Sequence, residues 1–78
     1  MKKIKPTVGY SIGAVERDVG IRSATLRIWE RRYGFPKPVR ADGGDRVYPE
    51  DQLERLRLIR RLMNHGFRPT QVLLKRPL

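Results

Sequence analysis

The sequence of 78 residues contains no cysteine and one histidine. Without cysteine, the chain can form neither disulfides nor thiolate metal sites, and it has no thiol nucleophile. His65 stands beside Gly66, where a cation would complement the negative end of a helix, so we predict a structural role for it. Catalysis needs a nucleophile, a base or a metal in convergent geometry, and no glycine-rich phosphate loop is present. The sequence therefore predicts neither an enzyme nor a cofactor or metal site in this domain.

Long apolar runs are also missing. The longest aliphatic run is Val72-Leu73-Leu74, whereas a membrane span needs about 20 apolar residues and a signal-peptide core about 7 to 15. We expect no membrane association, and the cytoplasm is the expected location. A single core needs about 50 residues or more, so this length predicts one domain.

Acidic residues are few, since 8 Asp and Glu face 18 Lys and Arg, which gives a net charge of +10. Such a chain attracts anions over its whole surface, and nucleic acid is the obvious polyanion. Three of the lysines, Lys2, Lys3 and Lys5, lie in a segment without apolar periodicity. We therefore predict a flexible basic arm over residues 1–8, followed by a domain over residues 9–78.

Two short helices joined by a glycine turn are predicted near the start of this domain. Ser11 can cap a first helix over residues 12–18, and Gly20 can adopt the positive φ of a tight turn. Ser23 is the predicted cap of the second helix, which ends at Gly34. Two helices connected in this way form a helix-turn-helix.

The second helix has two distinct faces. At 100° per residue, Leu26, Trp29 and Tyr33 form one apolar stripe that we expect to face the core, with Phe35 packing back on the last turns. Glu30 lies nearer this side, where we expect it to orient an arginine rather than read a base. The opposite side carries Ala24, Thr25, Ile28, Arg31 and Arg32, with Arg27 at its edge.

A β-hairpin is predicted after this helix. Residues 39–40 and 46–48 alternate in polarity on either side of a turn-rich loop over residues 41–45. A two-stranded ribbon is not stable alone in water. We expect it to lean on the helices through Val39, Val47 and Tyr48.

A third helix is predicted to begin with Pro49 at its first position and to run to about His65. Asp51 and Arg55 have the spacing of a stabilising i, i+4 pair, and Phe67 is expected to clasp Leu62 after the helix ends. A last short helix is predicted over residues 69–74, before Pro77. The third helix has an apolar face of Leu53, Leu56, Ile59, Leu62 and Met63, and a solvated face of Arg55, Arg57, Arg60 and Arg61.

Three motifs carry a resemblance to a known family. They are Tyr10-Ser11-Ile12-Gly13 with Gly20-Ile21, the run Thr-Leu-Arg-Ile-Trp-Glu-Arg-Arg-Tyr-Gly-Phe-Pro over residues 25–36, and Arg46-Val47-Tyr48. Over residues 9–75 the chain resembles the N-terminal DNA-binding domain of MerR-family transcription regulators. The resemblance implies a mainly α single domain with a small β-hairpin, the winged helix-turn-helix. Ile28 and Arg68 depart from the pattern, because they replace a tyrosine of metal-sensing members and a capping Ser or Thr of many members.

The resemblance also implies that the protein has a surface that binds double-stranded DNA. Arg27 matches the recognition-helix arginine, and Arg46 and Tyr48 match the arginine and tyrosine of the wing. A recognition helix of this kind enters the major groove. With the basic residues around them, the predicted DNA-binding residues are Arg22, Ser23, Ala24, Thr25, Arg27, Ile28, Arg31, Arg32, Lys37, Arg40, Arg46 and Tyr48.

Within that family, the Trp-Glu-Arg-Arg-Tyr-Gly string looks like the branch of light- and cobalamin-linked repressors of carotenoid genes. The resemblance therefore implies a bacterial repressor that occupies one half of an operator. It also implies a monomeric fragment of a protein that is a dimer or larger at full length, with any cobalamin site in a missing C-terminal region. Two alternatives remain open: an acidic, DNA-mimicking antirepressor protein that docks on the same basic face, and general nucleic-acid or RNA binding.

Overall fold

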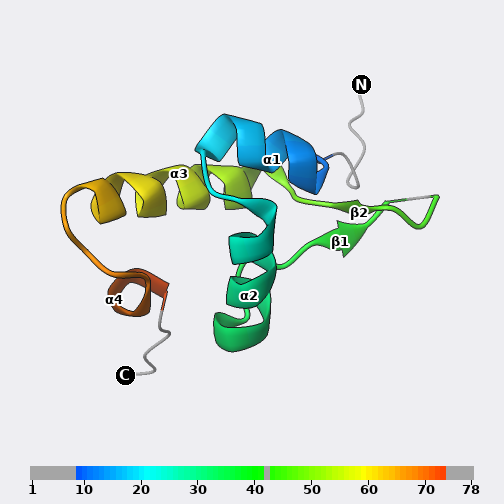
Figure 1. Cartoon of the computed structure of the whole chain (residues 1–78). Helices are drawn as coiled ribbons and strands as arrows, with labels where there is room; N and C mark the ends of the chain where they lie inside the picture. The colour runs from blue at the N-terminus through cyan, green and yellow to red at the C-terminus, as the bar shows by residue number, and fades with distance from the viewer. Residues whose placement is uncertain (1–8, 42, 74–78) are drawn as a thin grey trace.

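The computed structural model describes residues 9–41 and 43–73. α1 and α3 lie alongside each other, α2 crosses below them, and the hairpin projects away from α4 (Figure 1). This arrangement confirms the predicted mainly α fold with a small β-hairpin. The predicted basic arm, Leu74 and Pro77 lie outside the described residues. The elements in chain order are α1 (Ile12–Val19), α2 (Ser23–Tyr33), β1 (Val39–Arg40), β2 (Arg46–Val47), α3 (Glu50–Asn64) and α4 (Pro69–Leu73).

Both ends of α1 are formed as predicted, whereas the start of α2 is not. Ser11 caps α1, because its Oγ accepts a hydrogen bond from the Ala14 N–H at 3.2 Å. Gly20 ends α1 with φ +85°, a conformation that costs a residue without Cβ little. The prediction that Ser23 caps α2 is wrong: Arg22 occupies the cap position without a side-chain cap, and the Ser23 hydroxyl donates to Glu16 Oε1 at 2.5 Å. The Ser23 hydroxyl therefore connects α2 to α1 instead of capping α2.

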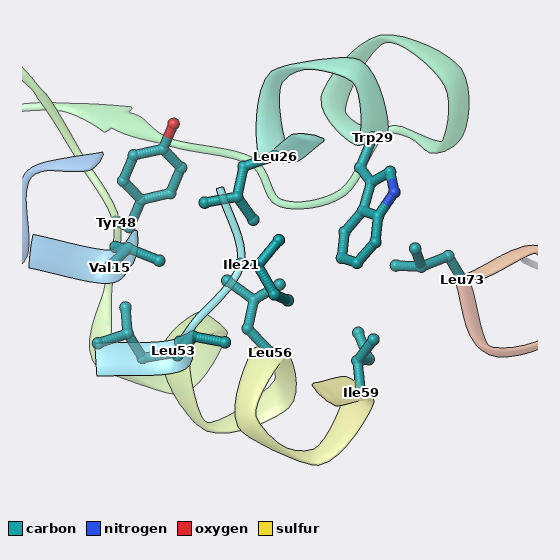
Figure 2. Packing of buried hydrophobic residues seen from close by; sticks show 10 residues of the cluster. Val15, Ile21, Leu26, Trp29, Tyr48, Leu53, Leu56, Ile59 and Leu73 are labelled. Carbon is teal, nitrogen blue, oxygen red and sulfur yellow. The ribbon is translucent and has the colours of Figure 1, made fainter. Parts of the chain in front are cut away.

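The core collects side chains from all four helices and from the end of the hairpin (Figure 2). Leu26 is fully buried and Trp29 is 4% exposed, while Tyr33 and Phe35 pack against the core from its edge. The predicted inward stripe of α2 is thus confirmed. The buried hydrophobic residues are Val15, Val19, Ile21, Leu26, Trp29, Tyr48, Leu53, Leu56, Ile59 and Leu73.

The hairpin is anchored by one aromatic residue rather than by its strands. Val39 pairs with Val47 in antiparallel register, but Val39 is 41% exposed, so its predicted packing on the helices is wrong. Each strand is only two residues long, too short to lay a row of side chains on the helices. Tyr48, just after β2, is 1% exposed, and its ring lies beside Val15 and Leu26 (Figure 2).

Hydrogen bonds hold Tyr48 at both its backbone and its hydroxyl. Its amide N–H donates to the Tyr10 carbonyl at 2.8 Å, and its carbonyl accepts from the Tyr10 N–H at 2.9 Å. Its hydroxyl donates to Glu30 Oε2 at 2.6 Å. Burial, followed by this hydrogen bond, raises the pKa of Tyr48 to about 12. Tyr48 therefore joins the root of the hairpin to the segment before α1 and to α2.

α3 begins one residue later than predicted, because Pro49 is its N-cap and Glu50 its first residue. Arg57 forms ion pairs with Asp18 on α1 and, at 3.6 Å, with Glu50. The hydrogen bond to Asp18 raises the pKa of Arg57. Arg60 Nη1 donates to the Gly20 carbonyl at 2.9 Å. These arginines therefore fasten α3 to α1 and to the turn after it, in addition to facing solvent.

Arg55 on α3 departs from its predicted partner. Its guanidinium carbon lies 4.3 Å from the centre of the Phe35 ring, a cation–π contact. Among residues 9–41 and 43–73, the ion pairs all involve Arg57, so the predicted pair between Asp51 and Arg55 is not formed. The guanidinium of Arg55 lies over the aromatic residue that follows α2 instead.

The end of α3 is closed by backbone groups. The Phe67 N–H donates to the Leu62 carbonyl at 3.1 Å, but the Phe67 side chain is 47% exposed, so the predicted hydrophobic clasp is wrong. His65 Nδ1 lies 2.9 Å from the Arg61 carbonyl, in agreement with the structural role predicted for this histidine. Leu73 of α4 packs against the core beside Trp29 (Figure 2). None of the helices described is long and apolar enough to cross a membrane.

Gly9 and Gly13 make a matched pair for testing the junction at Tyr48. A Cβ at Gly9 would lie 2.8 Å from the Tyr48 carbonyl oxygen, whereas a Cβ at Gly13 on α1 meets only ordinary contacts, the nearest at 3.9 Å. We expect Gly9→Ala to lower the free energy of unfolding by about 1 to 3 kcal/mol through overpacking. Gly13→Ala is expected to raise it by about 0.5 kcal/mol. Urea unfolding measures both, and equal stability of the two variants would contradict this account of the junction.

Tyr48→Phe tests the hydroxyl that reaches α2. At neutral pH we expect a loss of about 1.5 to 3 kcal/mol, the usual range for a hydrogen bond to a charged group. Folding raises the pKa of Tyr48 from 10.0 to about 12. The protonated hydroxyl therefore contributes fully to the free energy of unfolding below pH 10, and this contribution is lost as the pH rises toward 12. The stability advantage of the wild type over Tyr48→Phe is therefore expected to shrink across that window in denaturant titrations.

Tyr10→Phe is the control for this experiment. The Tyr10 hydroxyl donates to Glu50 Oε1 at 2.6 Å, and this hydrogen bond raises the pKa of Tyr10, but the side chain is exposed. We expect a smaller loss of stability than for Tyr48→Phe, because water replaces an exposed hydrogen bond. An equal loss in the two variants would show that the buried contact with Glu30 has no special weight.

Candidate nucleic-acid interface

The outward face of α2 is cationic and open to solvent. Arg27, Arg31 and Arg32 are exposed, and the guanidinium of Arg32 lies 5.9 Å from the ring centre of the neighbouring Tyr33. Ala24 is exposed, Thr25 is half-buried, and Ile28 is 42% exposed. The burial of Trp29 on the other side leaves this face free for a ligand.

The hairpin adds two arginines that lie directly opposite each other. Arg40 on β1 pairs with Arg46 on β2, and both side chains are exposed. Like charges at such cross-strand positions oppose pairing. Arg40 is held in place by a hydrogen bond from its Nη1 to the Gly44 carbonyl at 3.0 Å. An anion between the two guanidinium groups would remove the repulsion.

α2 and the hairpin enclose two hollows that share Arg27 and Arg46. The larger, of about 560 Å³, opens between the start of α1, α2 and the hairpin. The smaller, of about 350 Å³, is lined by Arg27, Glu30, Arg31 and Arg46. The residues around the larger hollow are Ser11, Ile12, Arg27, Arg40, Gly44, Asp45, Arg46, Val47 and Tyr48. The structure thus brings arginines from separate elements to one surface.

Tyr48 and Glu30 are hydrogen-bonded to each other, which differs from the role predicted for each of them. Tyr48 was expected to contact DNA, but its ring is buried and its hydroxyl donates to Glu30. Glu30 was expected to orient an arginine, whereas its Oε2 accepts the hydrogen bond from Tyr48. The carboxylate lines the smaller hollow together with three arginines. Their hydrogen bond therefore links the end of the hairpin to α2 at the border of the two hollows.

The other predicted site residues lie outside these hollows. Arg22 is exposed before α2, and the hydroxyl of Ser23 is engaged by Glu16. Lys37 is exposed, but its backbone N–H and carbonyl are both bound by the side-chain amide of Gln52, each at 2.7 Å. It belongs to a separate hollow of about 220 Å³ near Phe35.

Sequence reasoning missed several residues of the surface. Ser11 and Ile12 line the larger hollow because the backbone bridge between Tyr10 and Tyr48 brings the start of α1 to the hairpin. Asp45 places one negative charge near its arginines. Local periodicity contains no signal for the bridge, which joins positions 38 residues apart in the chain (48 − 10). Among the described residues, no group of His, Cys, Asp and Glu could hold a metal ion.

Comparisons with known proteins agree with this architecture. Residues 10–72 match the family described as MerR HTH family regulatory protein. The HTH-type transcriptional repressor CarA of Myxococcus xanthus is 51% identical over 53 residues, which cover 67% of this chain and 18% of CarA. The HTH-type transcriptional regulator MlrA of Escherichia coli strain K12 is 41% identical over 63 residues, which cover 81% of this chain and 26% of MlrA. The chain therefore spans less than a third of the length of either relative.

A solved structure extends the agreement to three dimensions. HiNmlR, a MerR family regulator lacking the sensor domain and crystallised bound to promoter DNA, superposes with a TM-score of 0.67 and 25% identity. The match covers 83% of this chain and 52% of HiNmlR, and it supports the winged helix-turn-helix assignment. All the relatives named are regulators, in agreement with the expectation that the chain is not an enzyme. The family match over residues 10–72 shows that the chain belongs to the MerR family of helix-turn-helix regulatory proteins.

Proposed function

We propose that this chain binds double-stranded DNA sequence-specifically, with α2 in the major groove and the hairpin as a wing over adjacent phosphates. The observation that carries the proposal is the convergence of Arg27 and Arg31 on α2 with Arg46 on the hairpin around one hollow. A major groove admits an α-helix, and guanidinium groups bind both base edges and phosphates. The promoter DNA bound by HiNmlR supports the same use of this fold.

The exposed residues divide into two sets. We assign contacts with base edges to the residues in the N-terminal half of α2: Ala24, Thr25, Arg27 and Ile28. We assign phosphate contacts to the basic residues just before α2, near its C-terminal end, in the segment after it and on the hairpin: Arg22, Arg31, Arg32, Lys37, Arg40 and Arg46. Ser23 contributes through the positive N-terminal end of α2, since its hydroxyl is engaged by Glu16. Tyr48 acts indirectly, because it positions the strand that carries Arg46.

The regulatory role proposed for the whole protein is repression. Its support is the 51% identity with the repressor CarA and the position of this domain in a family of transcription regulators. We infer that the domain occupies one half of an operator at carotenoid genes. We also infer that the full-length protein dimerises through other regions. Arginines contribute to the lining of both hollows described above, so these hollows suit anions. We therefore infer that any effector site, cobalamin included, lies outside the residues of this domain.

Arg27→Ala and Arg46→Gln test the division between base and phosphate contacts. On a duplex selected from a random pool, Arg27→Ala is expected to cost about 1 to 3 kcal/mol and to reduce the preference over a scrambled duplex. Arg46→Gln is expected to weaken binding to both duplexes alike. If five phosphates are contacted, log K falls against log salt with a slope of about −4.5, and Arg46→Gln makes it shallower by about 0.9. Fluorescence anisotropy over a salt series measures all three quantities.

Arg61→Gln is the matched control, because it removes one charge from an exposed position on α3. We expect it to leave both the preference and the slope close to those of the wild type. The opposite result, in which Arg61→Gln alters sequence preference while Arg27→Ala does not, would move the binding surface to α3.

General binding to single strands is disfavoured by the burial of Trp29, which leaves no indole for base stacking. Single-stranded RNA at equal salt is therefore expected to bind more weakly than the duplex.

A second ligand for the same surface is an acidic antirepressor protein that imitates the charge of DNA. The observation that favours it is the exposed pair Arg40 and Arg46 at facing positions of the hairpin, next to the exposed arginines of α2. Complementary charge steers such an encounter. Titration of an acidic DNA-mimicking protein into the complex with labelled duplex is expected to release the duplex. A ternary complex that retains both ligands would contradict a shared surface.

A further inference from the structure

Ile28 is an apolar side chain on an otherwise polar and cationic helix face. It is 42% exposed and belongs neither to the core nor to the residues packed against the core. Among the described residues, it is the one large exposed hydrophobic side chain on α2. Its side chain is therefore accessible to a ligand that approaches the outward face of α2.

The helical period places Ile28 near the middle of the outward face. At about 100° per residue, Ala24 and Arg31 lie within about 60° of it, while Leu26 points about 160° away into the core. Ala24 has a short side chain and is exposed. This end of α2 can thus approach a groove floor closely, with Ile28 directed at the bases.

The chemistry of isoleucine restricts what it can recognise there. It has no hydrogen-bond donor or acceptor, and the apolar group displayed in the major groove is the C5-methyl of thymine. In a helix its β-branched side chain keeps one strongly preferred rotamer, so little side-chain freedom is lost on contact. Cytosine would instead present an amino donor to an apolar surface, which leaves the donor without a partner.

We propose that Ile28 contacts a thymine C5-methyl group in the major groove and thereby sets the preference for thymine at that base position. The inference rests on the proposed duplex binding and adds a base identity to it. Its specificity differs from that of the arginines around it, because their donors recognise acceptor groups on guanine or on phosphate. One methyl group in the duplex then carries the discrimination.

The test removes that methyl group and nothing else. A duplex selected from a random pool by the 78-residue chain is resynthesised with each thymine replaced, one at a time, by deoxyuridine. At the contacted position we expect the wild type to lose about fourfold in affinity, as for one buried methyl group. Ile28→Ala is expected to bind the thymine duplex more weakly and to bind the thymine and deoxyuridine duplexes equally. Ile28→Val, which keeps a β-branched apolar side chain, is expected to retain most of the discrimination.

Leu58→Ala is the control, because Leu58 is 51% exposed but lies on α3. It is expected to leave the discrimination unchanged. The inference is overturned if the wild type binds every deoxyuridine duplex as tightly as the thymine duplex, or if the discrimination survives in Ile28→Ala. The proposed duplex binding stands in both cases. If no sequence is enriched from the pool and no duplex is bound, the proposed function fails, and this inference fails with it.

Discussion

The burial of Tyr48 is the constraint on which the basic surface depends. A hairpin with two residues in each strand has little structure of its own. Its orientation is fixed because one aromatic ring is inserted between α1 and α2 and its hydroxyl is bound by Glu30. Arg46 lies two residues before that ring, and Arg27 lies about one turn before the carboxylate. The distance between these two arginines is thus determined by an interaction beneath the surface.

The arginines of this chain perform three physically different tasks. Arg57 and Arg60 connect α3 to α1 and its turn by an ion pair and a carbonyl hydrogen bond. Arg55 lies over the Phe35 ring. On α2 and the hairpin, exposed arginines gather around shared hollows: Arg27, Arg31, Arg40 and Arg46. A net charge of +10 alone cannot separate these tasks, because it counts structural and ligand-facing guanidinium groups equally. Packing decides which of them remain available to an anion.

The parts of the fold that could be predicted from sequence depend on neighbours within a few residues. The inward stripe of Leu26 and Trp29 follows from the helical period, and the cap at Ser11 follows from local hydrogen bonding. Two of the expectations that proved wrong, at Ser23 and Val39, depend on partners in other elements, and the expected pair between Asp51 and Arg55 failed because Arg55 lies over the Phe35 ring of another segment. The hydroxyl of Ser23 found Glu16 on the preceding helix, and the packing role expected of Val39 belongs to Tyr48. The site divides in the same way, since the exposed face of α2 could be foreseen but not the bond between Tyr48 and Glu30.

The backbone bridge between Tyr10 and Tyr48 separates two properties of the hairpin, its direction and its reach. Direction is set at the root, where the bridge, the buried ring and the start of α3 meet. Reach depends instead on the number of residues between β1 and β2, where Gly44 and Asp45 are exposed. Relatives with longer or shorter loops can therefore keep the same angle between hairpin and recognition helix while spanning different lengths of a ligand. Variation in target length within such a scaffold requires no change in its core.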